Sequence, residues 1–450
     1  MQPNALLDAL LAEAGMSHAG LAAHVNQAGR TRGLALRYEH TAVARWLKGQ
    51  RPRGQVPDLI CEVIGGRLRR SLSLDDAGFG LPGQSADPHG RCGGTVPLSG
   101  FVDRAAALWR SDDHGRQCLA ADALTGTPAV IPVWEWENPP EDADVSRDGP
   151  TRVGPEHIEI LRAARAHYEL MYRRAGGVAT RDRIVRFLGT ETAPMLRGSY
   201  SDGLGRSLYR AGGSLVAVAG ICAYDSDAHG LAQRYFHQAL RLAKASGDRG
   251  LGAYVIALIV NQCLHLREFR QAVAFAEAAL RAAGRHTTPA LAADLYAMQA
   301  KAYAQLGDTR AALACIRKAE AAADRIRPGT EPDETGYVQP GLVNVQVAEA
   351  LLGLGDLRAA HEQAAAAVGT PAHDRGRVHR LAMLCEIQLR QGQADQAVAA
   401  AAEMAERARG MESLRLRDRL RTVREQLLTS GCSGAEETAE LIDGALRVPL

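Results

Sequence analysis

The sequence predicts an all-α protein in which a small N-terminal helical domain precedes a long α-solenoid of helical hairpins. Hydrophobic residues make up 46% of the 450 residues, but aromatic residues make up only 5%. Ala is abundant, and Ala is the best helix former and a poor strand former. From residue 157 to residue 448 the apolar positions follow the helical period, with short breaks marked by Gly or Pro.

Composition divides the chain into three parts. Residues 1–80 have a helical pattern and are predicted to form a separate domain, whereas residues 81–156 are interrupted by Gly and Pro and are predicted to form a linker with one helix near 102–124. Residues 157–450 are predicted to form the repeat domain.

The first part is predicted to contain five short helices, near residues 5–14, 17–25, 40–48, 57–70 and 73–80. In the third helix Val43, Trp46 and Leu47 share one face and should anchor the helix in the core, while Gly49 ends it. Short side chains near its start would allow close approach to base edges, and Arg45 is long enough to contact a guanine. Helix length, spacing and the Gly49 stop favour a helix-turn-helix.

Positive charge is concentrated in this part of the chain. Between residues 30 and 70 there are ten basic and three acidic residues, a local balance of +7 in a chain with a formal net charge of +2. Such a local excess is typical of a surface that binds DNA phosphates. A small helical oligomerisation module with a basic face is the alternative. The predicted DNA-binding residues are Ser17, Arg30, Arg32, Arg37, His40, Thr41, Ala42, Arg45, Lys48, Arg51 and Arg53.

In the linker, Trp134 and Trp136 alternate with Val133 and Glu135 in a Pro-bounded segment. We interpret this segment as an extended strap packed against the first repeat helices, because exposing two Trp side chains is costly. An exposed docking segment is the alternative.

The third part contains an internal repeat of five segments. Each segment has a turn residue, an Ala five positions later and, seven positions after that, a second Ala, which is replaced by Met in the last segment. Positions seven apart lie on one face of a helix, so small residues there let a neighbouring helix approach closely. A non-repeating, Ala-rich bundle is the alternative. The turn residues are Asp227, Arg267, Gly307, Gly355 and Gly392, and the first Ala residues are Ala232, Ala272, Ala312, Ala360 and Ala397.

Two resemblances follow from these motifs. Ala300, Tyr303, Leu306, Gly307 and Asp308 form a pattern that resembles the tetratricopeptide repeat (TPR). The stretches "GLAAHVN", "YEHTAVARWLKGQRPRG" and "AGICAYDSDAHGLAQRYFHQALRLA" make the chain similar to actinobacterial Xre/Cro-type helix-turn-helix regulators with a C-terminal TPR-like domain. This resemblance implies a DNA-binding regulator of development or antibiotic production, with "TAVARWLKG" as its recognition helix. The connection between the second and third helices is about ten residues longer than the family's tight turn.

A solenoid of this kind has a concave surface, which the first helix of each hairpin should line. We expect this groove to bind a peptide, small-molecule or protein effector, and we expect the repeat domain to form a homodimer that places two recognition helices on double-stranded DNA as a repressor. A TPR scaffold or adaptor that binds no DNA is the alternative. The predicted groove residues are Asn261, Gln262, Gln299, Lys301, Asn344, Gln346, Arg380 and Glu386.

No motif indicates an enzyme or a cofactor. The chain lacks a P-loop, an HExxH metal motif and a G-x-S-x-G nucleophile elbow, and its eight cysteines are dispersed without a CxxC spacing. We therefore predict no catalytic site, no metal and a reduced, cytoplasmic protein without a signal peptide or membrane span. The acidic segments at 139–144 and 331–334 are predicted to be solvated loops.

Overall fold

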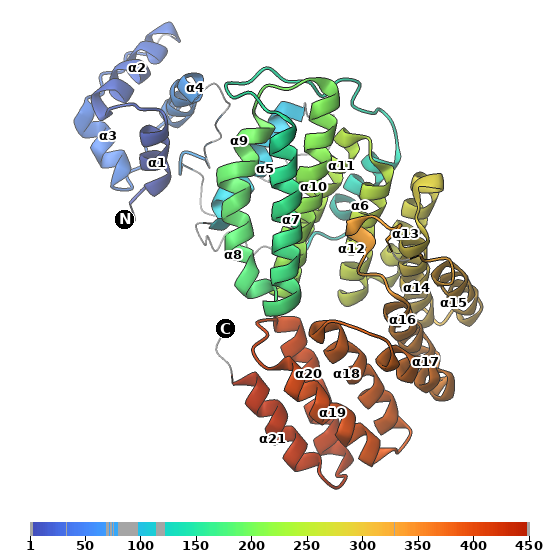
Figure 1. Ribbon diagram of the computed structural model, residues 1–450. Coiled ribbons are helices and arrows are strands. Elements are labelled where there is room, and N and C mark those ends of the chain that lie inside the picture. Colours follow the sequence, from blue (N-terminus) through green and yellow to red (C-terminus); the bar gives the residue numbers. More distant parts are fainter. Residues whose placement is uncertain are drawn as a thin grey trace. The chain divides into compact units, whose positions relative to one another are not determined.

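The computed structural model describes residues 3–32, 34–68, 72, 74, 76–79, 98–113, 122–327 and 329–447. The chain forms two compact units, Met1–His114 and Gly115–Leu450, here called the N-terminal unit and the repeat unit. The described residues are mainly helical, and from α10 onward the helices of the repeat unit follow one another in chain order (Figure 1), so the predicted all-α class with a helical solenoid is confirmed.

The helices have the following bounds. The N-terminal unit contains α1 (Ala5–Glu13), α2 (His18–Thr31), α3 (His40–Leu47), α4 (Val56–Leu68) and α5 (Leu98–Asp113). The repeat unit contains α6 (Thr127–Glu137), α7 (Pro155–Ala175), α8 (Gly177–Phe187), a π-helical turn (Leu188–Thr192), α9 (Ala193–Leu196), α10 (Asp202–Asp225), α11 (His229–Ser246), α12 (Arg249–His265), α13 (Phe269–Ala283), α14 (Pro289–Gln305), α15 (Thr309–Ala323), α16 (Pro340–Gly353), α17 (Leu357–Gly369), α18 (Asp374–Arg390), α19 (Ala394–Ala408), α20 (Leu414–Ser430) and α21 (Ala435–Leu446). Short 3₁₀ turns lie at Gly284–His286 and Asp333–Thr335.

The core of the N-terminal unit is built from one face of each of its first four helices. Asn4 caps α1, and its side-chain amide also donates to the Ala77 carbonyl at 2.9 Å, so it ties the start of the chain to the segment after α4. Trp46 is 4% exposed and its ring makes an edge contact with Tyr38 at 5.1 Å between centroids. The apolar side chains of this core include Leu7, Leu10, Leu11, Leu21, Val25, Val43, Trp46, Leu59, Ile60, Ile64 and Phe79.

The length of α2 and the segment after α4 differ from the prediction or lie partly outside the described residues. Helix α2 continues to Thr31 rather than ending near residue 25, because Val25 and Gly29 stay on its buried face. The predicted fifth helix lies partly outside the described residues, and Leu74 and Asp76–Gly78 form turns. Residues 81–97, the start of the predicted Gly- and Pro-rich linker, also lie outside the described residues, as do Arg69 and Arg70 of the basic cluster.

The repeat unit is a series of helix pairs, α10 with α11, α12 with α13, α14 with α15, α16 with α17 and α18 with α19. The predicted small residues all lie on the second helix of a pair, and all are fully buried. Because Ala adds little more than a methyl group, the next helix packs directly against this face. The repeat positions, all without exposed surface, are Ala232, Ala239, Ala272, Ala279, Ala312, Ala319, Ala360, Ala367, Ala397 and Met404.

The turn between the helices of each pair has a left-handed residue at the predicted position. Gly307, Gly355 and Gly392 have φ values of 77°, 82° and 75°, which glycine adopts without steric cost. Asp227 and Arg267 have φ values of 58° and 63°, which are unfavourable for residues with a Cβ atom. The first two pairs therefore keep the same turn geometry at a conformational cost that packing must offset.

The segment with two Trp residues is helical, which corrects the extended strap. In helix α6, residues two apart point in nearly opposite directions, so Trp136 is 1% exposed whereas Trp134 is 58% exposed. Trp136 packs against α12 at Gly252, where a Cβ atom would lie 2.0 Å from the indole nitrogen. Packing therefore holds one Trp, and the other faces solvent.

The acidic loop at 331–334 is also different from the prediction. Glu334 is 4% exposed and accepts hydrogen bonds from Arg210 at 3.1 and 3.3 Å and from Ser214 at 2.8 Å, both on α10. Burial alone would raise the pKa of Glu334, but Arg210 reverses the effect and the pKa is lowered. Glu334 is thus hydrogen-bonded to α10, the first helix of the first pair, instead of being solvated. Within the described residues, no helix combines the length and apolar character needed to cross a bilayer.

We predict that Trp46→Ala destabilises the N-terminal unit by about 3–5 kcal/mol, because a large aromatic side chain would be removed from a packed core. Hydrogen exchange of the α2 and α3 amides in the full chain would measure this loss. Trp134→Ala, at an exposed position, is the control and should change stability by less than about 0.5 kcal/mol. Unchanged amide protection in Trp46→Ala would contradict the packing described for α3.

Candidate functional site

Helix α3 has one buried and one exposed face. Val43 and Trp46 are buried, whereas Thr41, Arg45 and Lys48 are exposed. At 3.6 residues per turn these three exposed positions fall along one side of the helix and its C-cap. The helix therefore presents a polar and basic strip while its opposite face is held in the core.

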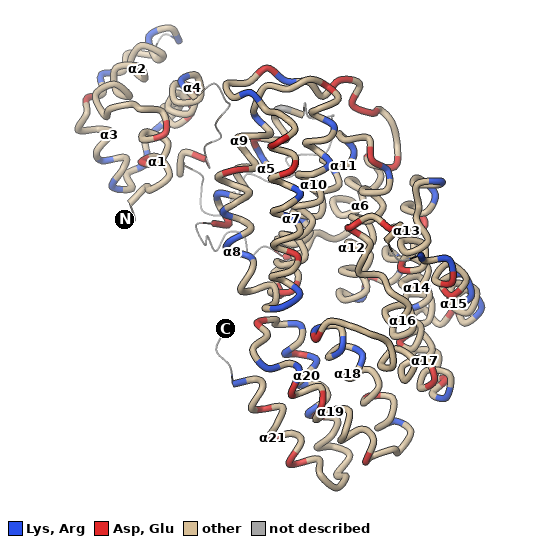
Figure 2. Tube along the Cα trace, viewed as in Figure 1, with Lys and Arg blue, Asp and Glu red and all other residues tan. Residues whose placement is uncertain are grey.

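Cationic side chains continue beyond the end of this helix. Lys48, Arg51 and Arg53 are exposed, and Figure 2 shows basic residues where the chain leaves α3 and at the end of α2. Within the described part of the chain, the side chains of Arg45, Lys48, Arg51 and Arg53 form no hydrogen bond or ion pair. Their positive charge is therefore available to an external anion.

Of the other six predicted DNA-binding residues, three are exposed, two are bonded within the N-terminal unit and one is buried. Arg30, Arg37 and His40 are exposed, as expected. Arg32 is exposed but forms an ion pair with Glu62 at 2.6 Å, and the Ser17 hydroxyl accepts from the Gly20 amide at 3.1 Å as the N-cap of α2.

Ala42 was expected to face a partner, and this is corrected. It is 4% exposed and belongs to the core of the N-terminal unit together with Val43 and Trp46. The helical period explains the difference, because Ala42 and Trp46 are four residues apart and therefore lie on the same face.

The connection between α2 and α3 is fixed by its own hydrogen bonds. The Asn26 side chain donates to the Tyr38 carbonyl at 2.8 Å and accepts from the Tyr38 amide at 2.8 Å. Gly29 allows Leu36 to pack on α2, since a Cβ atom there would lie 2.5 Å from the Leu36 side chain. The connection, shortened to 32–39 by the longer α2, is thereby held in a defined geometry.

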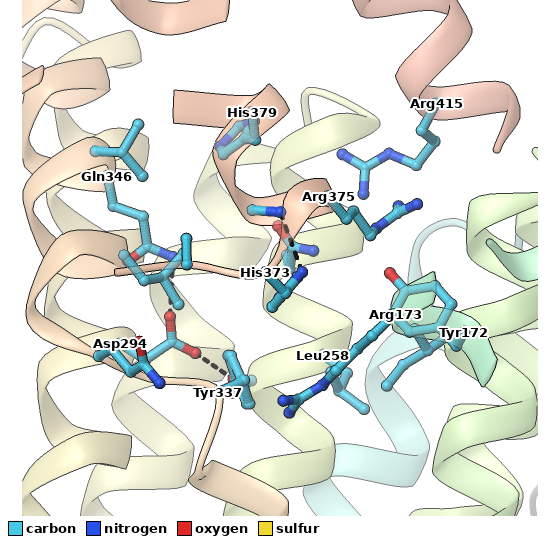
Figure 3. Close-up of a pocket in the computed structure, with 18 of the residues that line it drawn as sticks. Tyr172, Arg173, Leu258, Asp294, Tyr337, Gln346, His373, Arg375, His379 and Arg415 are labelled. Atoms are coloured by element: carbon cyan, nitrogen blue, oxygen red, sulfur yellow. Dashed lines mark hydrogen bonds between the residues drawn. The ribbon is translucent and has the colours of Figure 1, made fainter. Parts of the chain in front are cut away.

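The repeat unit encloses a cavity of about 620 Å³, a size typical of small-molecule sites. Most of its lining comes from α10, α12, α14, α16 and α18, the first helices of their pairs, and from α20. Helix α7 and Phe236 of the second helix α11 also contribute, which the sequence did not indicate. Apolar side chains such as Val218, Leu258 and Met298 form part of the wall. Figure 3 shows Asp294, Tyr337 and Gln346 on one side and Tyr172, Arg173 and Arg375 on the other.

Of the eight predicted groove residues, Asn261, Lys301, Gln346 and Arg380 line this cavity. The other four do not, because they contact neighbouring helices or their own helix. Gln262 donates to the His229 carbonyl at 2.7 Å, Gln299 is 3% exposed beside Cys315, Asn344 donates to Gln363 at 2.9 Å, and Glu386 accepts from Arg390 at 2.8 Å.

A buried carboxylate organises the cationic side of the cavity. Asp225, at the end of α10, accepts from the Gly177 amide at 2.7 Å and from the Ser413 hydroxyl at 2.7 Å, and it pairs with Arg375. The Arg375 guanidinium also lies 4.7 Å from the centroid of the Tyr172 ring. Ser413 in turn caps α20 through the Leu416 amide at 3.2 Å, so this network decides where α20 begins.

Helix α20 brings two further guanidinium groups to the cavity. Arg415 lies 4.0 Å from the centroid of the Tyr224 ring, and neither Arg415 nor Arg419 forms an ion pair within the described residues. In contrast, Lys301 is paired with Glu349 at 2.8 Å. The donors of Arg380 are occupied by the Ala367, Thr370 and Pro371 carbonyls and by the Thr370 hydroxyl.

The positive charge is reflected in neighbouring groups. The pKa of His379 lies well below its ordinary value because the ring is buried and Arg419 opposes protonation. Burial, followed by Arg173 and Arg375, lowers the pKa of His373 to about 4. Glu349 is half-buried, and desolvation would raise its pKa, yet Lys301 and Arg419 lower it to about 2. The neighbouring cations contribute to all three shifts, and the lowered pKa of Glu349 indicates a positive potential.

The opposite side of the cavity carries hydrogen-bonding groups. Asp294, 3% exposed, accepts from the Tyr337 hydroxyl at 2.7 Å and from the Gln346 amide nitrogen at 2.9 Å (Figure 3). Burial raises the pKa of Asp294. The Gln346 side-chain oxygen is buried and has no hydrogen-bond partner among the described residues.

One group of side chains in the described residues could approach a metal ion, which the sequence did not indicate. The ligand atoms of Asp227, His229 and His265 lie within 4.8 Å of one another. However, Arg415 lowers the pKa of both histidines, second only to burial for His265, and the same charge would repel a cation. This group is therefore a weaker candidate than the cavity.

Comparison with known proteins gives information on the N-terminal unit. The family model described as SP15 N-terminal domain matches residues 7–80. No curated protein matches the chain. The similarity covers α1 to α4 and the turns that follow them, and it does not extend to the repeat unit.

We predict that the chain loses stability as the pH falls below about 6.5. Histidines whose pKa is lowered in the folded chain bind a proton more weakly there than in the unfolded state, so acidification favours unfolding. For His265 and His373, whose pKa values are about 4, this window spans roughly pH 6.5 to 4. Urea denaturation at a series of pH values would measure the effect.

His379→Gln should flatten this pH dependence, because it removes a buried ring whose protonation is opposed. His286→Gln, at an exposed position of the repeat unit, is the control and should keep the parental profile. Equal profiles for all three proteins would contradict the lowered pKa of His379, to which burial contributes most and Arg419 next.

Proposed function

We propose that this protein is a DNA-binding transcriptional regulator whose repeat unit senses an effector. The N-terminal unit binds double-stranded DNA, with α3 in the major groove and the residues after α3 on the phosphate backbone. The repeat unit has a TPR-like character, forms a homodimer and binds the effector in its cavity. The regulator acts in the cytoplasm and belongs with the Xre/Cro-type family that its N-terminal sequence resembles.

The observation that carries this proposal is the exposed strip of Thr41, Arg45 and Lys48, continued by Arg51 and Arg53, in which the cationic side chains have no partner within the described residues. A helix that is anchored by Trp46 and carries basic groups on its free face has the properties required of a recognition helix. Arg45 is suited to a guanine because its guanidinium can donate two hydrogen bonds to O6 and N7.

The mechanism follows from the size of the reading surface. One helix-turn-helix contacts few base pairs, so tight and specific binding requires two copies on two half-sites. An effector that favours one arrangement of the dimer shifts the distance between the two α3 helices and therefore the affinity for the operator. Repression is the outcome that we propose.

A scaffold that binds no DNA is the second candidate, since helical repeats commonly hold protein partners. In that case the basic strip would contact an acidic protein surface. Binding to duplex DNA distinguishes the two candidates directly.

We predict that Arg45→Ala weakens binding to the preferred duplex by about 1–3 kcal/mol and relaxes one base preference, because it removes a contact to a base edge. Duplexes enriched by the parent chain from a random pool, together with the region upstream of its own gene, would serve as probes. Fluorescence anisotropy at several salt concentrations would provide the affinities.

Arg51→Ala should instead weaken binding to all duplexes by a similar factor and reduce the salt slope by about one, as expected for a phosphate contact. Arg358→Ala removes the same charge from a side chain that is 90% exposed in the repeat unit, and it should bind like the parent. Parental affinity and salt slope in both Arg45→Ala and Arg51→Ala would refute the assignment of α3.

We predict a homodimer with a mass of about twice 48.1 kDa in sedimentation velocity at micromolar concentration. A fragment comprising residues 115–450 is the matched sample and should dimerise equally, because we place the main interface in the repeat unit. A monomeric full chain at the concentration used for DNA binding would contradict the two-half-site mechanism.

A further inference from the structure

We propose that the cavity of the repeat unit binds a small anionic molecule with an apolar middle and an N–H or O–H donor at its other end. The anion, a carboxylate or a phosphate, is bound by Arg415 and Arg419, and the donor is bound by Gln346. This inference deepens the proposed sensing role, and it rests on that role for its biological meaning but not for the binding itself.

The charge balance of the lining indicates an anion. Six lining side chains carry a positive charge, namely those of Arg173, Lys301, Arg375, Arg380, Arg415 and Arg419. Three lining side chains are acidic, those of Glu169, Asp294 and Glu349. The cavity therefore has an excess of positive charge in a chain whose formal net charge is only +2.

Ion pairs and hydrogen bonds within the chain occupy four of the six cations, so the excess positive charge is located at the other two. Arg173 is paired with Glu169, Lys301 with Glu349, and Arg375 with Asp225 behind the wall. Arg380 is bound to carbonyl groups. Arg415 and Arg419 remain, one turn apart on α20, where two guanidinium groups can donate to the same anion.

The side of the cavity opposite the two arginines requires a hydrogen-bond donor from the ligand. The Gln346 residue is 8% exposed, its amide nitrogen is used by Asp294, and its oxygen has no partner among the described residues. A buried acceptor without a partner costs free energy, so a ligand with an N–H or O–H group would be stabilised there. Val345, Met298 and Leu258 add apolar surface to the lining of the cavity.

Two dyes form a matched pair of probes for this site. In 2-anilinonaphthalene-6-sulfonate an anionic group and an N–H donor lie at opposite ends of fused aromatic rings. N-phenyl-2-naphthylamine contains the same rings and donor but lacks the sulfonate. Fluorescence titration of the full chain, without DNA, compares their affinities, and thermal melting with each dye confirms that binding is to the folded state.

We expect the sulfonate dye to bind at one site per chain and about tenfold or more tightly than the neutral dye. Arg415→Gln and Arg419→Gln should each weaken the sulfonate dye by about tenfold, as expected for the loss of a charge-assisted hydrogen bond, and leave the neutral dye unchanged. Gln346→Met should weaken both dyes by a similar factor of about two to ten, because both present the N–H donor.

Arg421→Gln is the matched control on the same helix. Arg421 is exposed, pairs with Asp418 at 2.6 Å and does not line the cavity, so this variant should bind both dyes like the parent. Unchanged binding of the neutral dye shows that the cavity is intact in the arginine variants. A variant that fails to fold would lose both dyes and its melting transition, in which case the salt dependence of the parent decides: sulfonate affinity must fall with ionic strength while that of the neutral dye does not.

Three results would overturn the inference: absence of dye binding to the folded parent, equal affinities for the two dyes, or an effect of Arg421→Gln as large as that of Arg419→Gln. None of these results depends on DNA. Loss of the proposed DNA binding would leave the dye pattern intact, so the two failures can be told apart.

Discussion

The arrangement of the repeat unit depends on the buried carboxylate of Asp225. It accepts hydrogen bonds from the start of α8 and from Ser413, which is 188 positions away in the sequence, and it neutralises Arg375. A buried ion pair is costly to desolvate and is retained where further hydrogen bonds satisfy its oxygens. Here those hydrogen bonds also set the start of α20, and α20 places Arg415 and Arg419 at the cavity. One carboxylate thus connects the closure of the helical stack to the charge of the proposed site.

The solenoid leaves room for such a site because its own packing uses very small side chains. The Ala faces of the second helices bring neighbouring helices together, so the longer side chains of the first helices are free to line the concave side. Helix α7 and Tyr337, at the end of the loop fastened by Glu334, complete the wall. The cavity is therefore enclosed by the repeat helices together with elements that are not part of the repeat. This explains why a polar group such as Asp294 can be buried next to a space large enough for a ligand.

In the N-terminal unit the residues that stabilise the fold are different from the residues that carry the positive charge. Its core consists of apolar side chains from α1 to α4, whereas the cationic groups of α3 and of the residues after it lie outside that core. Substituting Arg45 or Arg51 should therefore alter binding without unfolding the unit. In the proposed regulator the N-terminal unit reads DNA and the repeat unit senses the effector, and an effector acts only through a difference in affinity for two arrangements of the dimer.

The sequence by itself determined the helical class, the repeat and the anchor of α3, because each depends on local periodicity. Spacing alone predicts the five turn positions, which have positive φ values, and the ten repeat positions, nine Ala and Met404, which are fully buried. The helical period also puts Ala42 on the same face as Trp46, four residues later. Tertiary structure alone decided which residues lie around the cavity. Tyr172, Asp225, Asp294, Tyr337 and Arg415 come from distant segments with no shared spacing, and only folding brings them together. It also decided that Glu334 is buried and that α6 is a helix, since an acidic loop and a pair of alternating Trp residues have the same local pattern in either environment. Local periodicity encodes which face of a helix is buried, but not which distant side chain it will meet.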